Sequence, residues 1–226
     1  MIISIAAFFA RALSWSGAAA AAGVGTIIFG WGGLPWAVLL LAFFISSSAL
    51  SRLAGRGKAS LIEKAAKGSR RDAGQVLANG GVATLLVLAY SLTQGGQAFS
   101  SSLAVNAPGL ILPPSSLFFA FAASLAAANA DTWATELGVL NKRPPVMITT
   151  GKRVDPGTSG GVSPTGTLAA LGGAGLIGLL AAGLAAVGSG MANFGTHFLV
   201  ITAAGLAGSL FDSLLGATWQ AVERQA

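Results

Sequence analysis

The sequence contains no cysteine, one histidine and one tyrosine, and only 9% of its 226 residues are charged. Without cysteine, a disulfide framework and a thiolate metal site are excluded. The single histidine, His197, lies in a long apolar run far from the charged residues, so a histidine-based catalytic or metal site is excluded among them. We interpret His197 as a structural or lipid-facing residue. A soluble domain carries about 25% charged residues, so a single soluble fold would have too little polar surface.

The charged residues that are present fall in four stretches, around Arg11 and at 52–72, 131–155 and 212–224. The segments between them are uncharged and rich in Ala, Leu, Gly and Phe. A membrane-spanning helix needs roughly 20 apolar residues, and helices satisfy their own backbone polar groups in lipid. Runs such as 168–187 lack the alternating polarity of barrel strands. The pattern predicts an all-α, polytopic membrane helical bundle.

We expect about six transmembrane helices in a single integral membrane domain, residues 1–226. The predicted spans are 14–30, 34–50, 74–92, 115–134, 168–187 and 194–217. The loops 51–72 and 135–165 hold seven and four basic residues, whereas the loops after the first, third and fifth spans hold none. The positive-inside rule therefore places both basic loops and both termini in the cytoplasm. The short apolar segment 2–10 is either the start of the first helix or an interfacial piece.

The first candidate feature is a polar segment before and within the third span. Arg70 and Arg71 can grip phosphate oxygens with their planar guanidinium groups. Gln75 and Asn79 follow at helical spacing, so both project from one helix face. Anionic lipid or phosphate ligands suit these cations better than nucleic acid, because the net charge of +6 lies between membrane segments. The alternatives are topology anchors for the basic residues and inter-helix hydrogen bonding for the amides.

The second feature is a set of three carboxylates near the inner ends of spans, Asp131, Glu136 and Asp212. Ionisable groups at membrane depth are costly, so they usually pair, bind ions or line a cavity. Three oxygen ligands converging at one depth would suit Mg²⁺, which prefers carboxylates, waters and phosphate oxygens. The alternatives are a helix cap for Asp131 and a solvated interfacial residue for Glu136.

The third feature is a glycine-rich loop within residues 149–163. Glycines permit backbone conformations that turn successive N–H groups toward an anion, and hydroxyls and cations lie beside them. The candidate phosphate-binding residues of this loop are Lys152, Gly157, Thr158, Ser159, Gly160, Gly161 and Ser163. No Walker A string occurs, and an ordinary flexible connection is the alternative.

Four motifs together resemble the phytyl-phosphate kinase and transmembrane protein 19 family. They are Asn129–Glu136, Gly157–Ser163, Arg71–Gly80 and Asp212–Ala217, and the resemblance spans nearly the whole chain. The family is similar to the CTP-dependent polyprenol kinases, which include dolichol kinase and phytol kinase. Its plant and cyanobacterial members are linked to tocopherol and phylloquinone biosynthesis. The resemblance implies a phosphotransferase that uses CTP to convert a phytyl or geranylgeranyl monophosphate into the diphosphate.

The resemblance and the residue patterns indicate one site at the inner ends of the third, fourth and sixth spans. In this hypothesis Asp131, Glu136 and Asp212 position Mg²⁺ on the nucleotide phosphates. The glycine-rich loop and Lys152 would hold the triphosphate, and Arg70 and Arg71 the acceptor phosphate. Asp131, Lys152 and Asp212 are then the expected catalytic residues, and Asn79 an additional phosphate-binding residue.

Two other functions use similar residues. One is a membrane cytidylyltransferase that makes a CDP-linked lipid and releases pyrophosphate. The other is a small-solute transporter, which small-residue helices and buried carboxylates also suit. The expected partners are a prenyl monophosphate, a nucleoside triphosphate and membrane lipids, without nucleic acid.

Overall fold

The computed structural model describes residues 2–58, 70–93, 114–141 and 143–219, and these residues are mostly helical. The helices are α1 (Ile2–Phe9), α2 (Trp15–Ile27), the π-helix η1 (Ile28–Gly32), α3 (Leu34–Lys58), α4 (Ala73–Thr93), α5 (Pro114–Gly138), α6 (Pro164–Ser189), the 3₁₀-helix η2 (Met191–Asn193) and α7 (Phe194–Trp219). Two short antiparallel strands, β1 (Val146–Met147) and β2 (Gly161–Val162), are paired between α5 and α6. The expected all-α fold is confirmed.

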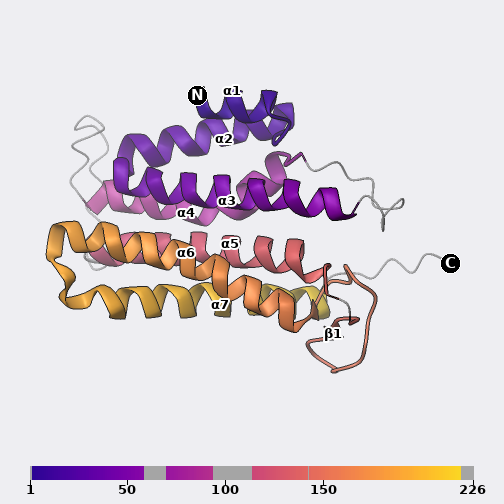
Figure 1. Cartoon of the computed structure of the whole chain (residues 1–226). Helices are drawn as coiled ribbons and strands as arrows, with labels where there is room; N and C mark the ends of the chain where they lie inside the picture. Colours follow the sequence, from indigo (N-terminus) through magenta and orange to yellow (C-terminus); the bar gives the residue numbers. More distant parts are fainter. Residues whose placement is uncertain (1, 59–69, 94–113, 142, 220–226) are drawn as a thin grey trace.

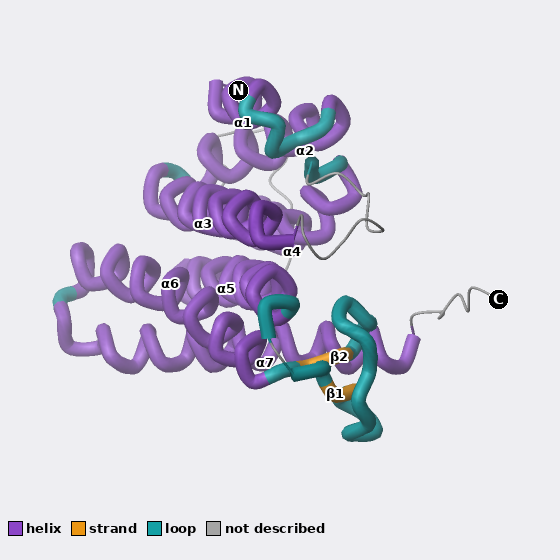
Figure 2. The backbone as a smooth tube through the Cα atoms, turned by 45° about the vertical axis from the view of Figure 1, so that its right-hand side comes forward, coloured by secondary structure: helices purple, strands orange, loops and turns teal. Residues whose placement is uncertain are grey.

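The long helices lie side by side, from α1 and α2 on one side, through α3 and α4, to α5, α6 and α7 on the other (Figure 1). Helix α5 occupies the centre of this arrangement, because it packs against α3, α4, α6 and α7. The β1–β2 hairpin projects from one end of the bundle (Figure 2). The connections that carry the sequence motifs therefore meet at that end.

Four helical segments among the described residues are long and apolar enough to cross a membrane. They are Leu34–Leu53, Ala73–Thr93, Pro164–Val187 and Met191–Trp219, which coincide with four predicted spans. The predicted spans 14–30 and 115–134 coincide with α2–η1 and with α5. Helix α2 has only 13 residues before it widens into η1, and α5 carries the polar Asn129–Glu136 motif.

Two boundaries differ from the sequence-based expectation. Helix α3 continues to Lys58, eight residues beyond the predicted end at residue 50, because no proline interrupts this stretch. The start of the predicted loop 51–72 is therefore helical, and its residues 59–69 lie outside the described residues. At the N-terminus, α1 is a separate helix, because Arg11 has a φ of 58° and turns the chain before α2.

Side-chain caps determine where α2 and α4 begin. Ser14 accepts a hydrogen bond from the Gly17 N–H at 3.1 Å and caps α2. Before α4, the Gln75 N–H donates to Asp72 Oδ1 at 2.9 Å, while the Asp72 N–H faces Gln75 Oε1 at 3.4 Å. This reciprocal arrangement is a capping box. All these caps satisfy backbone donors that the first helical turn leaves free.

Small residues let α5, α6 and α7 approach one another closely. A Cβ added at Gly205 of α7 would lie 2.7 Å from the Ala126 Cβ and 2.9 Å from the Ala174 Cβ. Similarly, a Cβ at Gly173 would lie 2.9 Å from the backbone oxygen of Asn129. Close approach at small residues is the usual basis of helix association in membranes. The side chains that follow on these helices are therefore held at short range.

Candidate functional site

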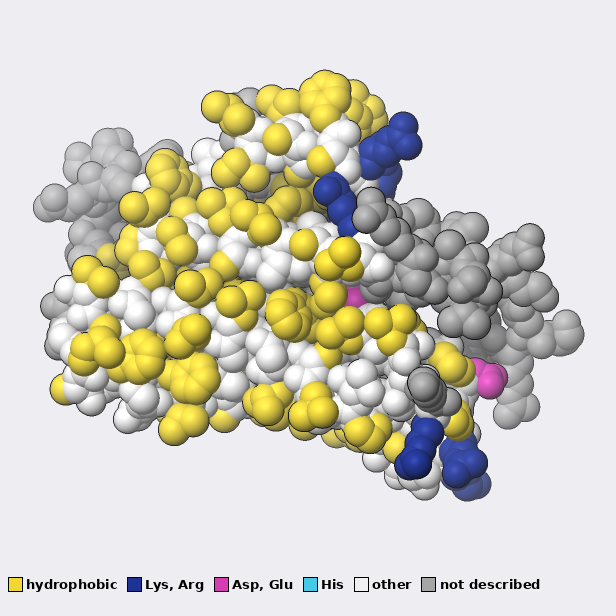
Figure 3. Space-filling model, in the orientation of Figure 1, with side chains coloured by type: hydrophobic (Ala, Val, Ile, Leu, Met, Phe, Trp, Pro, Cys, Tyr) yellow, Lys and Arg dark blue, Asp and Glu magenta, His cyan; other side chains and the backbone are white. Residues whose placement is uncertain are grey.

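The charged side chains of the described residues gather at the end of the bundle that carries the β1–β2 hairpin, whereas the rest of the visible face is largely hydrophobic (Figure 3). This distribution follows from the topology, because successive long helices run in opposite directions. The segment before α4, the end of α5 and the end of α7 therefore lie at one end. Candidate residues as far apart in the sequence as Asp131 and Asp212 become neighbours there.

Asp131 and Asp212 are brought together by the contact between α5 and α7. A Cβ added at Gly208 would lie 2.6 Å from the Ala127 Cβ, so the two helices are in close contact at this level. Asp131 and Asp212 each follow these contact residues by four positions, which places them one turn further along the same helix faces. Their charges interact. Asp131 is half-buried and Asp212 is exposed, so the pair can meet a ligand from the end of the bundle.

Glu136 faces a different part of the site. It follows Asp131 by five positions in the helix, which turns its side chain by about 140° around α5. Its Oε1 accepts a hydrogen bond from Ser51 Oγ of α3 at 2.9 Å, and its charge interacts with that of Arg71. In the described ranges, no three histidine, cysteine, aspartate or glutamate side chains form a group that could hold a metal ion. The three predicted metal ligands are thus divided into an Asp131–Asp212 pair and a separate Glu136.

Arg71 is held rigidly just before α4. Its N–H donates to the Ala12 carbonyl oxygen and its own carbonyl oxygen accepts from the Ser14 N–H, both at 3.0 Å. Its guanidinium carbon lies 5.6 Å from the centre of the Phe43 ring, within the range of a cation–π contact. Burial lowers the pKa of the Arg71 guanidinium, and the charge of Glu136 acts in the opposite direction. An arginine nevertheless stays charged in a protein, so Arg71 presents a fixed cation.

Of the other predicted residues of this polar segment, Arg70 lies apart from Arg71, whereas Gln75 and Asn79 line the same cavity as Arg71. Arg70 is exposed, and its guanidinium carbon lies 5.9 Å from the centre of the Phe8 ring of α1. Asn79 is half-buried on α4 and, with Gln75, lines a cavity between α1, α2, α3 and α4. Of the two arginines, Arg71 is therefore the one that connects this cavity with Glu136.

The glycine-rich loop packs against α7 close to Asp212. Gly160 is buried with a φ of 78°, and an added Cβ would collide with Ala217. A Cβ added at Gly216 would likewise collide with Ser159 Oγ. Gly216 follows Asp212 by four residues, so the loop covers the turn of α7 next to that carboxylate. The close packing explains why both positions are glycine.

Other loop residues have defined structural partners. Thr158 Oγ1 donates to the Asp155 carbonyl oxygen at 2.8 Å, and Gly157 is exposed with a φ of 88°. Ser163 Oγ accepts from the Gly166 N–H at 3.1 Å and thereby caps α6. Lys152 is exposed in the segment between the two strands. The loop therefore offers an exposed cation beside a backbone that turns sharply at two glycines.

A polar contact between three helices was not predicted from the sequence. The side chain of Asn129 is fully buried, and its Oδ1 accepts from Ser46 Oγ of α3 at 3.1 Å. Its Nδ2 donates to the Gly173 carbonyl oxygen of α6 at 2.8 Å. These bonds connect α3, α5 and α6 directly beside the carboxylates. The run of serines from Ser46, continued by Ser51, in the otherwise apolar α3 was the available signal.

The family model described as "Integral membrane protein DUF92" matches residues 1–226 of this chain. The chain is 36% identical to Protein PGR of Arabidopsis thaliana over 224 residues, which cover 97% of this chain and 76% of that protein. It is 32% identical to an uncharacterized membrane protein of Methanocaldococcus jannaschii over 213 residues, 93% of this chain and 76% of the relative. An uncharacterized membrane protein of Synechocystis is 30% identical over 201 residues, which cover 87% of this chain and 68% of that protein. No solved structure matches. These matches confirm the resemblance that the four motifs indicate.

Proposed function

The chain belongs to the DUF92 family of integral membrane proteins, and we propose that it transfers the γ-phosphoryl group of CTP to a prenyl monophosphate. The observation that carries this proposal is the meeting of the Asp131–Asp212 pair, Arg71 and the glycine-rich loop at one end of the bundle. A carboxylate pair and separate cations are what two phosphorylated substrates require. We further propose that this end faces the cytoplasm, because it carries the basic segments.

The donor side of the proposed site is formed by α5, α7 and the loop. Asp131 and Asp212 would hold Mg²⁺, which neutralises negative charge on the nucleotide phosphates. Two carboxylates fit this ion, since Mg²⁺ in phosphoryl-transfer sites usually takes one or two carboxylates and completes its shell with waters and phosphate oxygens. The backbone around Gly157 and Gly160, with Lys152 nearby in the chain, would bind the triphosphate.

The acceptor side is formed by Arg71 and Glu136. Arg71 would bind the acceptor phosphate with its guanidinium, and Glu136, held by Ser51, would orient that guanidinium. In the step, an oxygen of the acceptor phosphate forms a bond to the γ-phosphorus while the bond to the β,γ-bridging oxygen breaks. CDP leaves with that electron pair. A phosphate oxygen is already ionised near neutral pH, so the acceptor needs no strong base.

The decisive experiment is a transfer assay on purified protein with Mg²⁺, γ-labelled CTP and phytyl or geranylgeranyl monophosphate. Labelled prenyl diphosphate and CDP are expected. The Asp131→Asn variant should lose at least about 100-fold in rate, because it removes one of two charges that bind the metal–nucleotide complex. The matched control is Asp72→Asn, because asparagine retains the capping bond to the Gln75 N–H.

The products separate this proposal from its alternatives. Release of pyrophosphate with formation of a CDP-linked lipid would replace the kinase with a cytidylyltransferase. Solute uptake into vesicles without nucleotide, and no label transfer, would favour a transporter. Near-normal transfer by a folded Asp131→Asn variant would refute the role assigned to the carboxylate pair.

A further inference from the structure

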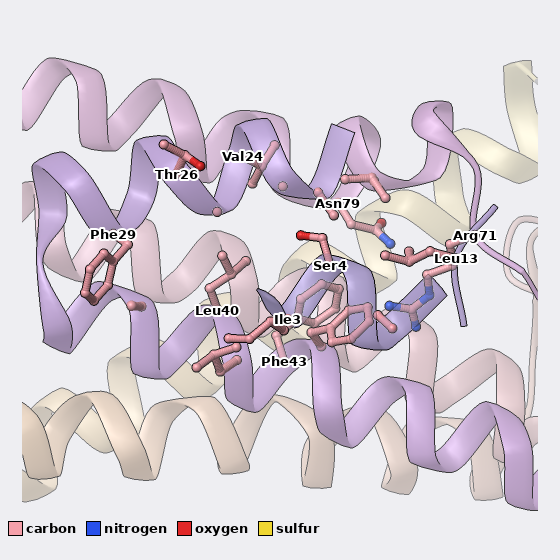
Figure 4. Close-up of a pocket in the computed structure, with 18 of the residues that line it drawn as sticks. Ile3, Ser4, Leu13, Val24, Thr26, Phe29, Leu40, Phe43, Arg71 and Asn79 are labelled. Carbon is pink, nitrogen blue, oxygen red and sulfur yellow. The ribbon is translucent and has the colours of Figure 1, made fainter. Parts of the chain in front are cut away.

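A cavity of about 600 Å³ lies between α1, α2, α3 and α4, beside the proposed acceptor site. Its walls are almost entirely apolar, with side chains such as Val24, Leu40 and Phe44. Helix α1 closes one side, where Ser4 and Ala7 are buried against the cavity. Several wall positions on α2 and α4 are small, which leaves the interior open (Figure 4).

The charged group and the amide groups of the cavity are concentrated at one end, whereas the hydroxyls of Ser4 and Thr26 lie along its length (Figure 4). Arg71 and Asn79 lie together at that end, and Phe29 lies at the opposite end (Figure 4). Gln75 precedes Asn79 by one turn of α4 and also lines the cavity. Arg71 is in turn the residue whose charge interacts with Glu136 of α5. The cavity therefore joins a cationic end at the candidate site to an apolar interior.

We propose that this cavity holds the hydrocarbon chain of a single-chain prenyl phosphate, with the phosphate at Arg71, and that its size limits the chain length accepted. This inference rests on the proposed function, which requires such an acceptor. The cavity is complementary to that lipid, because the Arg71 guanidinium at one end matches the phosphate and the apolar walls beyond it match the hydrocarbon chain. One CH₂ or CH₃ group takes about the volume of a water molecule, roughly 30 Å³, so a cavity of about 600 Å³ holds roughly 20 carbons. That volume suits one chain of about twenty carbons and is too small for the two chains of a diacyl phosphate.

Gly25 is the position from which this proposal is best tested. It lines the cavity, and a Cβ added there would meet no atom within 4 Å. The Gly25→Phe side chain can thus enter the cavity without displacing the backbone of a neighbouring helix. The matched control is Gly23→Phe on the same helix, because Gly23 is exposed, does not line the cavity and also has free space around it.

The first measurement is the affinity of the protein for geranyl, farnesyl and geranylgeranyl monophosphate. It is obtained, without nucleotide, from the rise in the melting temperature of the protein that each compound causes. In Gly25→Phe, the affinity for geranylgeranyl monophosphate should fall by at least about tenfold, because losing the burial of even two methylenes has this effect. Geranyl monophosphate should bind as before. Leu40→Ala enlarges the same cavity and should shift the preference toward longer chains, so a poorly folded Gly25→Phe would not leave the proposal without a test. Inorganic phosphate and phosphatidic acid serve as head-group and diacyl probes.

The outcomes separate this inference from the proposed function. A length-dependent loss in Gly25→Phe that is absent in Gly23→Phe supports the cavity as the chain site, even if no transfer activity is found. Equal behaviour of both variants toward every chain length overturns it, and leaves the kinase proposal to the label-transfer assay. Stabilisation by phosphatidic acid equal to that by geranylgeranyl monophosphate also overturns it, because a diacyl lipid would then be accommodated.

Discussion

Replacing Gly205 by alanine should destabilise the bundle, although alanine is the better helix former. An alanine in place of glycine favours a helix by about 0.8–1.0 kcal/mol. At Gly205, however, the new Cβ would lie 2.7 Å from the Ala126 Cβ and 2.9 Å from the Ala174 Cβ. Overpacking of this kind costs about 1–3 kcal/mol. The matched variant is Gly175→Ala on α6, where a Cβ would meet no atom within 4 Å.

Comparing the two variants removes the helix-propensity contribution, because both positions are helical. The remaining difference is the overpacking cost of about 1–3 kcal/mol. At about 2–4 °C per kcal/mol for a chain of this size, Gly205→Ala should melt about 2–12 °C below Gly175→Ala. The measurement is thermal unfolding of both variants in one detergent, followed by tryptophan fluorescence. If Gly205→Ala melts at or above Gly175→Ala, the close contact of α5, α6 and α7 is wrong.

Two further predictions concern the polar contact between helices and the orientation of the bundle. Asn129→Asp should lower the melting temperature, by roughly 2–12 °C for a cost of about 1–3 kcal/mol, because a carboxylate cannot donate to the Gly173 carbonyl oxygen. An unchanged melting temperature would contradict the buried hydrogen bond. Because the chain has no cysteine, Thr149→Cys and Asn193→Cys, both at exposed positions, each introduce a single thiol. A membrane-impermeant maleimide added to intact cells should label Asn193→Cys only, and labelling of Thr149→Cys alone would reverse the proposed orientation.

The helical, membrane-embedded character of the chain could be predicted because it depends on composition along the sequence. Uncharged runs of about twenty residues between charged stretches indicate membrane helices whatever their neighbours are. The four segments from Leu34 to Trp219 that are long and apolar enough to span a membrane coincide with predicted spans. Helix ends were less predictable. The sequence marks no stop near residue 50, and α3 runs on to Lys58.

The residues of the candidate site could be named from the sequence, but their grouping could not. The five-residue spacing of Asp131 and Glu136 already implies different faces of one helix, and this signal was available. Which neighbours those faces meet depends on how α3, α4 and α7 pack around α5. The structure places Asp131 with Asp212, and Glu136 with Ser51 and Arg71. Both pairings join residues that lie far apart in the sequence.

The sequence by itself determined that this is a polytopic helical membrane protein with its charged residues concentrated at a few connections, because hydropathy and charge act locally along the chain. It also determined the family, through four motifs that extend over most of the chain. Only the tertiary structure decided that α1 closes an apolar cavity ending at Arg71, and that the glycine-rich loop packs on α7 beside Asp212. The physical reason is that both features arise from contacts between distant segments, and such contacts depend on the helix faces that the packing brings together.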